Sequence, residues 1–520
     1  MTTTNNLHWS NIDKRVRTTI MIGLALGMLV AILDGTIVAT AMPSILDNLG
    51  GHDMYSWVIT GFMLCETAMI PIAGKLSDQY GRKPIFLVGM AVFLSGSVLC
   101  AISGSMTELI LFRAIQGLGG GMLVPVATAA VADLYAPTER GKIQGMLGAL
   151  FAVAMCLGPF LGGFITEHIS WHWIFVINLP IGAIALAFTA TKFPKQEMQK
   201  AKIDYLGMGL LVGFIFTLLL FFTWAGQDFA WISIESFVMI MLAAALLILF
   251  IFAETKAREP VIRLSMFRNR TILCCAVTML IFGIGLMGLM AYLPMFMQIV
   301  MNMGATNSGI LLLPFVFGVM ITAMTSGFTV KRTGYLPWLL VGPVVTAAGM
   351  LLLSTLGMGS SSTTLFIYLF FTGLGMGCMM SVIMIAAQNN ATDGEMGMVT
   401  STVNLFRSIG STMAVGVFAT LINARMAIEL SSSLPPAIYD QVPHNVGILD
   451  WLSPENIGDH LMIIPYISDI INSFGESVTF AFMIGAFVVL TVLAVVIFIR
   501  GKPRDEVEEE NAFTKRVEEE

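Results

Sequence analysis

Residues 74–102 read GKLSDQYGRKPIFLVGMAVFLSGSVLCAI, and this stretch contains the pattern that the rest of the chain repeats. Its first ten residues carry charges of both signs and two glycines, whereas the nineteen residues 84–102 contain no charged side chain. A helix needs about 20 apolar residues to cross a bilayer, so 84–102 is long enough to do so. The stretch therefore predicts a short polar loop followed by a transmembrane helix.

The same pattern recurs along the 520 residues, of which 56% are hydrophobic and only 12% are charged. A soluble domain carries roughly 25% charged residues, so the composition excludes a soluble enzyme, a disordered protein and a secreted module. We predict an all-α integral membrane protein with fourteen spans, at 18–42, 55–73, 84–102, 107–132, 143–165, 173–191, 205–224, 233–253, 272–297, 306–329, 336–356, 364–387, 398–423 and 476–499.

The positions of lysine and arginine predict the orientation of these spans. Arg113 and Arg407 lie within spans and Arg425 lies near the outer face, which leaves 24 of the 27 basic residues in segments on one side. Basic residues favour the cytoplasmic side of a membrane. We therefore expect both termini in the cytoplasm of a cell, at a bacterial plasma membrane.

Two pairs of similar segments predict that the chain contains two copies of one six-helix unit. GKLSDQYG at 74–81 resembles GFTVKRTG at 327–334, and GLGGG at 117–121 resembles GLGMG at 373–377, with offsets of 253 and 256 residues. Parallel halves with a binding site at the midplane are a design of secondary transporters. The predicted organisation is a tail at 1–17, a six-helix bundle at 18–191, a linker at 192–204, two inserted helices at 205–253, a linker at 254–271, a second six-helix bundle at 272–499 and an acidic tail at 500–520.

One long outer segment, 426–475, interrupts the second bundle. Within it Ile467, Ile470, Ile471 and Phe474 have helical spacing. This spacing predicts a short amphipathic helix on the membrane surface, either as a lid over a substrate or as an inert cover.

Four charged residues fall inside predicted spans, namely Asp34, Glu66, Arg113 and Arg407. An ionised side chain in hydrocarbon is costly, so such residues face an internal cavity or a partner and often carry function. We expect Asp34 and Glu66 to bind a proton or a cationic substrate, or else to be structural acids. Arg113, and less strongly Arg407, needs an anionic or carbonyl partner.

The chain lacks the patterns of other functional classes. It has no phosphate-binding glycine loop with lysine, no metal-ligand spacing and no nucleophile–base set, so we expect neither an enzyme nor ATP drive, and no metal or cofactor. The basic residues follow membrane orientation and not a nucleic-acid stripe. The expected partners are a small-molecule substrate, protons and the lipid bilayer; the sequence identifies no accessory export protein.

Several motifs resemble those of the major facilitator superfamily and its fourteen-helix drug:proton antiporter branch. They are GKLSDQYGRK at 74–83, LILFRAIQG at 109–117, GPFLGG at 158–163, LDGTIVATAMP at 33–43 and WHWIFVINLPIG at 171–182. Two positions depart from the family pattern: His172 stands where arginine is usual, and the second-half loop has Lys331 where the first has Asp78.

The resemblance implies roles for particular residues. It implies proton coupling by Arg113 with Gln116, and an inner gate in which Asp78 docks at a helix N-terminus of the other half while Arg82 pairs with Asp133. The gate would also contain Gly74, Gly81 and Lys83. The fifth-span motif would comprise Gly148, Gly158, Pro159, Gly162 and Gly163, either sealing an exporter against leak or simply packing helices closely.

Together these features predict a proton-coupled exporter of amphipathic, cationic drugs that works by alternating access. An exporter of a single metabolite or of an anion balanced by Arg113 is the alternative. A channel or a receptor that does not transport is a third possibility, which the intramembrane charges and the repeat disfavour.

Overall fold

The computed structural model describes residues 12–51, 54–194, 203–226, 228–392, 394–439, 442 and 464–499. These residues form helices and no strand, and fourteen helical segments among them are long and apolar enough to cross a membrane. The predicted fold class and number of spans are therefore confirmed. The C-terminal tail, residues 1–11 of the N-terminal tail, most of the linker 192–204 and much of the outer segment lie outside the described residues, whereas the end of the N-terminal tail leads into the first helix.

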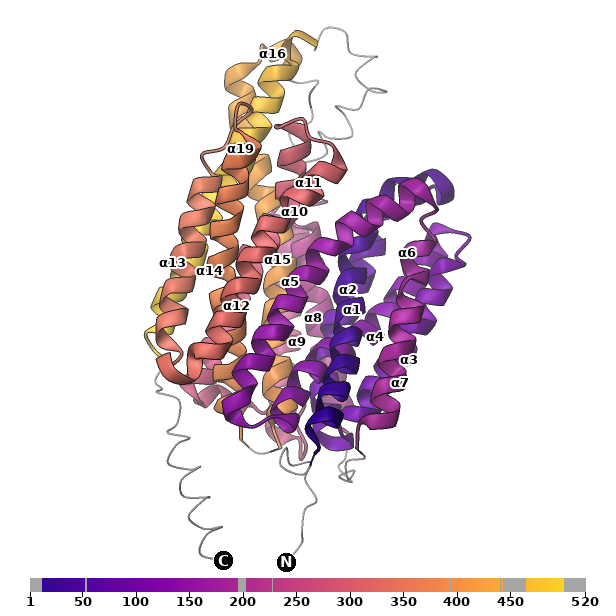
Figure 1. Ribbon diagram of the computed structural model, residues 1–520. Coiled ribbons are helices and arrows are strands. Elements are labelled where there is room, and N and C mark those ends of the chain that lie inside the picture. The colour runs from indigo at the N-terminus through magenta and orange to yellow at the C-terminus, as the bar shows by residue number, and fades with distance from the viewer. Residues whose placement is uncertain are drawn as a thin grey trace, which may run out of the picture.

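The helices fall into three groups along the chain (Figure 1). The first group contains α1 (Lys14–Leu49), α2 (Tyr55–Tyr80), α3 (Arg82–Ala101), α4 (Met106–Leu134), α5 (Pro137–His168), α6 (Trp173–Val176) and α7 (Asn178–Lys192). The inserted group contains α8 (Tyr205–Trp224), α9 (Ile234–Lys256) and the 3₁₀ helix η2 (Leu264–Arg268). The last group contains α10 (Arg270–Ile299), α11 (Ala305–Leu311), α12 (Leu313–Thr333), α13 (Leu336–Leu353), α14 (Ser362–Asn389), α15 (Met396–Ser433), α16 (Pro436–Tyr439), η3 (Ile464–Tyr466) and α19 (Ile467–Val496).

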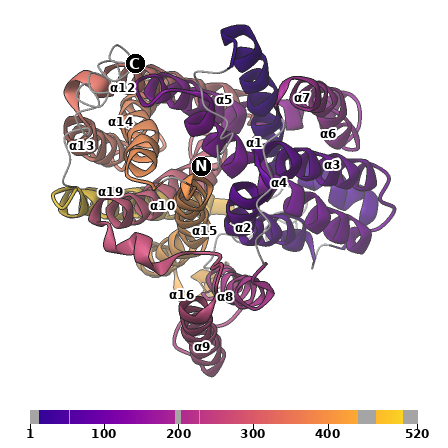
Figure 2. The same cartoon turned by 90° about the horizontal axis from the view of Figure 1, so that it is seen from below.

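The first and last groups pack their helices in the same pairs. In the first half α2 and α3 pack on α4, and α1 packs on α5 and α7; in the second half α12 and α13 pack on α14, and α10 packs on α15 and α19. The halves meet along two seams, where α2 contacts α15 and α5 contacts α12. Seen from below, the halves lie side by side and α8 and α9 project outside them (Figure 2). We call the face where α1 begins and α19 ends the lower face, as in Figure 1.

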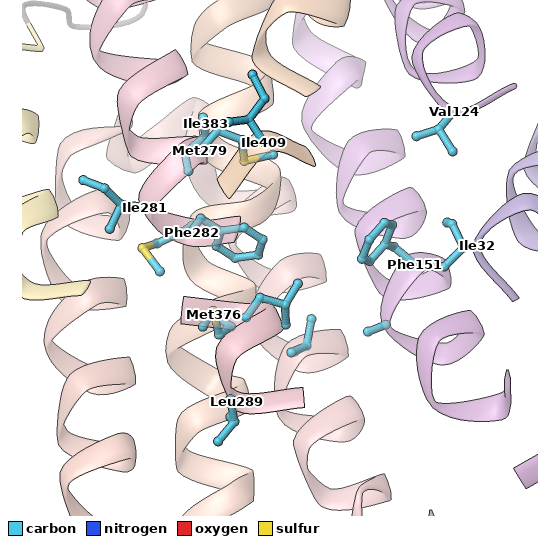
Figure 3. Packing of buried hydrophobic residues seen from close by; sticks show 14 of the residues in the cluster. Ile32, Val124, Phe151, Met279, Ile281, Phe282, Leu289, Met376, Ile383 and Ile409 are labelled. Atoms are coloured by element: carbon cyan, nitrogen blue, oxygen red, sulfur yellow. The ribbon is translucent and has the colours of Figure 1, made fainter. Parts of the chain in front are cut away.

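Buried apolar side chains continue across the boundary between the halves. Figure 3 shows Met279 and Phe282 of α10 on one side and Phe151 of α5 on the other, directed toward the space between the halves. Met376 of α14 is fully buried, whereas its neighbours Met380 and Met384 line the central cavity described below. The halves are thus held together mainly by apolar packing with a few polar contacts set into it.

Two sequence predictions about loops are wrong. The segment 74–80 continues α2 as helix, and the chain turns only at Gly81, with φ of +91°; likewise α12 runs to Thr333 and the turn is at Gly334, with φ of +74°. Glycine adopts this left-handed conformation without strain from a Cβ. Polarity at 74–80 therefore marks the end of the apolar span and not the end of the helix.

The predicted surface helix at 467–474 is also wrong as a separate element. It forms the first turns of α19, which continues without interruption to Val496. Ile470 and Phe474 are fully buried in the bundle, while Asn472 and Glu476 are exposed, and no proline interrupts the helix. At its other end the outer segment starts later than predicted, because α15 runs to Ser433.

Candidate functional site

A buried polar network lies inside the first half, centred on Asp34 of α1. Asp34 forms an ion pair with Arg113 of α4, and its Oδ1 accepts hydrogen bonds from Gln116 Nε2 at 2.9 Å and Asn178 Nδ2 at 2.8 Å. Both amides also donate to Ser97 Oγ, at 2.8 and 2.9 Å. Asp34, Gln116, Asn178 and Ser97 are fully buried and Arg113 is 1% exposed. The network thus joins α1, α3, α4 and α7.

Arg113 is held on all sides within this network. Its Nη1 donates to Gln116 Oε1 at 2.8 Å and its Nε donates to the Val58 carbonyl at 3.4 Å. The guanidinium carbon lies 4.0 Å from the centroid of the Phe62 ring, a cation–π arrangement. Three side-chain donors, from Arg113, Gln116 and Asn178, therefore face the two oxygens of Asp34.

The structure brings together Asp34, Arg113 and Gln116, all of which the sequence singled out. Asn178 lies in the quoted motif at 171–182 but received no role, and Ser97 was missed. Ser97 is an ordinary small residue in an apolar span, so only its position beside both amides marks it.

Glu66 of α2 and Arg407 of α15 form a second pair of charges, at the seam between the halves. Neither side chain has a hydrogen bond or ion pair among the described residues. The residues after them, Thr67 and Ser408, are joined by a 2.7 Å hydrogen bond across the seam. Arg407 otherwise lies with its guanidinium carbon 5.0 Å from the centroid of the Phe151 ring.

Arg407 lines a small cavity of about 30 Å³ between the halves. Apolar and thioether groups make up most of its wall, with a few polar groups among them. The lining residues are Met28, Val124, Thr128, Gln144, Leu147, Gly148, Phe151, Met279, Met380, Ser381, Met384, Asn404 and Arg407. This wall combines adaptable apolar contact with a small number of polar anchors, as the walls of small-molecule sites do, and in this state the cavity has room for about two water molecules.

At the lower end of the cavity, whose wall includes Gln144 and Thr128, amide side chains cross from one half to the other. Gln144 Nε2 donates to Gln388 Oε1 at 3.0 Å, and Gln388 Nε2 donates to the Thr128 carbonyl at 3.0 Å. Further down, Arg140 Nη1 donates to Asn389 Oδ1 at 3.3 Å. The sequence analysis missed this layer, although two buried glutamines at the ends of apolar spans are a signal that could have found it.

At the lower face Asp78 closes the α2–α15 seam. Its two carboxylate oxygens accept hydrogen bonds of 2.8 Å from the backbone N–H groups of Gly397 and Met398, at the N-terminus of α15. This end of a helix dipole favours an anion. Arg82 lies 2.7 Å from Asp78 and 2.8 Å from Asp133, so it joins α2, α3 and α4.

The other predicted gate residues have different positions. Gly74 lets α2 approach α15, since a Cβ there would lie 2.4 Å from the Ser401 Cβ. Gly81 makes the turn between α2 and α3. Lys83 does not reach the seam: its Nζ donates to the carbonyls of Ala190 at 2.7 Å and Phe193 at 2.8 Å, at the end of α7.

The glycines of α5 divide between two partners. A Cβ on Gly148 would lie 3.0 Å from Ser381 Oγ of α14, so this residue lies at the boundary between the halves. A Cβ on Gly158 would lie 1.9 Å from Thr36 Oγ1, and one on Gly162 would lie 2.1 Å from Thr40 Oγ1, so the motif packs against α1 within the first half. A Cβ on Gly163 would meet no neighbouring helix or side chain within 4 Å, and Pro159 lies inside the continuous helix between the Gly158 and Gly162 contacts.

Within the described residues, no three side chains of histidine, cysteine, aspartate or glutamate lie close enough together to hold a metal ion. The six cysteines are all free thiols.

Comparison with known proteins gives consistent matches over nearly the whole chain. The profile of the Major Facilitator Superfamily matches residues 24–415. Multidrug resistance protein 3 of Bacillus subtilis (strain 168) is 36% identical over 496 residues, which cover 93% of this chain and 95% of that protein. Multidrug transporter protein MdtP of the same organism is also 36% identical, over 428 residues that cover 82% of this chain and 79% of that protein.

Solved structures agree on the fold. The human organic anion transporter MFSD10 (TETRAN) matches with a TM-score of 0.60 at 16% identity, covering 91% of this chain and 99% of that one. A bacterial homolog of the human lysosomal transporter Spinster, inward-facing and unoccupied, matches with a TM-score of 0.58 at 14% identity, covering 93% and 97%. The fourteen spans, the paired halves and these matches together lead to one assignment: the chain belongs to the major facilitator superfamily and is a membrane transporter, not an enzyme.

Proposed function

We propose that this transporter exports amphipathic, drug-like molecules across the cell membrane in exchange for protons. The observation that carries the proposal is the central cavity between two similarly packed halves, with Arg407 in its wall and Glu66 nearby. The names of the Bacillus subtilis relatives support a multidrug substrate range. Exchange for protons would use a carboxylate that is open both to protonation and to the substrate.

Transport would proceed by alternating access. The hydrogen bonds of Gln144, Asp78 and Arg140 close the lower side of the cavity, while the halves diverge toward the upper face in Figure 1. A second state would break these lower contacts and bring the upper ends together. Substrate and proton would shift the balance between the two states by binding them unequally.

Glu66 is our candidate for the proton carrier. It is half-buried, it has no hydrogen-bond partner in the part of the chain that the structure describes, and it lies across the seam from Arg407. Protonation would weaken its attraction to Arg407, and a cationic substrate would compete with the proton for the same carboxylate. Asp34 is less suited to the role because its carboxylate already accepts from Arg113, Gln116 and Asn178.

Export of a cationic dye by everted membrane vesicles with an imposed pH gradient tests this assignment. Glu66→Gln mimics the protonated form, so we expect export that no longer responds to the gradient, with the protein still present in the membrane. Glu108→Gln is the matched control, because that carboxylate lies at the start of α4, where it accepts from the Gly104 N–H at 2.9 Å. Gradient-dependent export at the wild-type rate by Glu66→Gln would remove Glu66 from the mechanism.

Export of an organic anion is the second candidate function, and it is favoured by the guanidinium of Arg407, which lines the cavity and has no hydrogen bond among the described residues. Arg113 cannot balance the charge of an anion in the cavity, since it is paired with Asp34. Arg407→Gln separates the two functions: it should abolish export of an anionic dye if anions are the substrates, and should preserve export of a cationic dye if cations are. Both dyes are measured in the same vesicles.

We also propose that the lower face is cytoplasmic, because basic residues gather there and favour that side. A reporter fused after Arg270 should report the cytoplasm, and one fused after Leu434 should report the outside. The opposite result at either position would reverse the orientation, and with it the direction of transport.

A further inference from the structure

The segment 257–269, here called the strap, connects the inserted helix α9 to α10 of the second half. Its regular structure is limited to η2, yet three of its apolar side chains are buried: Val261 is fully buried, and Ile262 and Met266 are 5% and 6% exposed. Glu254, near the end of α9, accepts a 3.1 Å hydrogen bond from the Val261 N–H. The strap is therefore anchored in the bundle and is not a loose connection.

An ion pair of Glu259 joins the strap to the first half. Lys75 Nζ of α2 lies 2.9 Å from Glu259 Oε2, and Lys75 is only 5% exposed. Lys75 lies one helical turn before Asp78, the residue that docks on α15. A buried ammonium whose carboxylate is removed becomes an uncompensated charge, so this pair matters more than an exposed one.

The strap contacts the second half beside the N-terminus of α15. Arg263 forms an ion pair with Glu395, and the Arg263 N–H donates to Met398 Sδ at 3.1 Å. The Met398 N–H in turn donates to Asp78. The strap thus lies directly against the point where Asp78 closes the seam, and touches both sides of it.

We propose that the strap is a third component of the lower gate, and that the Lys75–Glu259 ion pair must break whenever α2 separates from α15. The strap continues into α10 and its Arg263 forms an ion pair with Glu395 beside α15, so it moves with the second half. The Lys75–Glu259 ion pair connects it to the first half. The two inserted helices thereby bias the gate toward the closed state. This inference rests on the alternating access proposed above, but not on the substrate or on protons.

The test measures how often the lower seam opens. Ser401 is 1% exposed beneath Gly74 in the closed state, so a thiol at this position reacts with a water-soluble maleimide only when the seam opens. The background is Ser401→Cys in a chain whose six native cysteines are replaced by alanine. Glu259→Gln should raise the labelling rate about fivefold or more, the lower end of typical coupling between sites.

Two further variants keep the test decisive. Lys75→Met/Glu259→Gln removes both charges, so it avoids a buried unpaired ammonium and should fold while still labelling faster than the parent. Arg258→Gln neutralises an exposed strap residue next to Glu259 and should label at the parent rate. If the double variant also labels at the parent rate, the strap is not part of the gate. Because labelling needs no dye and no pH gradient, this outcome is distinct from failure of proton-driven export.

Discussion

Substitution of Asp34 by asparagine gives the sharpest test of the buried network. The change keeps the size of the side chain but leaves one oxygen where there were two, and removes the negative charge. Arg113, Gln116 and Asn178 all direct donors at the present carboxylate. At least one of these donors must then face an NH₂ group, and the guanidinium of Arg113 loses its counter-charge in a fully buried setting.

The size of the effect follows from these contacts. Breaking a buried ion pair by removing one partner costs about 3–5 kcal/mol. Arg113 keeps Gln116 Oε1, the Val58 carbonyl and the Phe62 ring, which places the expected loss at the lower end, about 3 kcal/mol. Asp34→Asn/Arg113→Gln removes both charges and should recover a large part of this loss.

Thermal unfolding of the purified protein in detergent measures the loss, with dye export by everted vesicles as the second measurement. We expect Asp34→Asn to lower the Tm clearly, the double variant to lower it less, and Glu66→Gln to leave it close to wild type. The reasoning is refuted if Asp34→Asn unfolds at the wild-type temperature but loses gradient-driven export while Glu66→Gln retains it. Asp34 would then be the proton carrier.

Three further predictions follow from individual contacts. Asp78→Asn removes a charged acceptor from the N-terminus of α15, so it should slow dye export while leaving dye binding and membrane insertion near wild type; loss of expression would instead indicate a purely structural role. Gly158→Ala forces a Cβ to within 1.9 Å of a threonine oxygen and should lower the Tm, whereas Gly163→Ala, with open space around it, should not; equal Tm values would contradict the packing. The hydrogen bond from Lys75 lowers the pKa of Glu259, so the ion pair is present above the ordinary glutamate pKa and is lost only as the pH falls through the lowered value. The labelling rate at the lower seam, divided by that of an exposed reference cysteine so that the falling thiolate fraction cancels, should therefore stay constant from pH 8 to about 5, and a steep rise of this ratio within that range would contradict the prediction.

Local properties of the sequence determined how many apolar spans there are and where the apolar residues of each span stop. Length and apolar content gave fourteen spans because the cost of placing charge in lipid acts on each helix separately. The similar segments 74–81 and 327–334 indicated corresponding positions in the two halves, and the structure has positive φ at the last glycine of each, Gly81 and Gly334. Polarity misled us at 74–80 and 467–474, since a helix continues beyond the bilayer until the backbone itself is interrupted.

Partnerships between charges required the tertiary structure. The sequence identified Asp34, Glu66, Arg113 and Arg407 as costly residues. It did not show that Asp34 is paired with Arg113, or that Glu66 and Arg407 have no hydrogen bond to any residue that the structure describes. Which side chains meet depends on the rotation of each helix about its axis and on its depth in the bundle, and all the packed side chains set these together. The α5 glycines contact different partners for the same reason: Gly148 lies against the other half and Gly158 lies against α1. One helix crosses different neighbours along its length, and the spacing of residues in the sequence does not show which neighbour each of them meets.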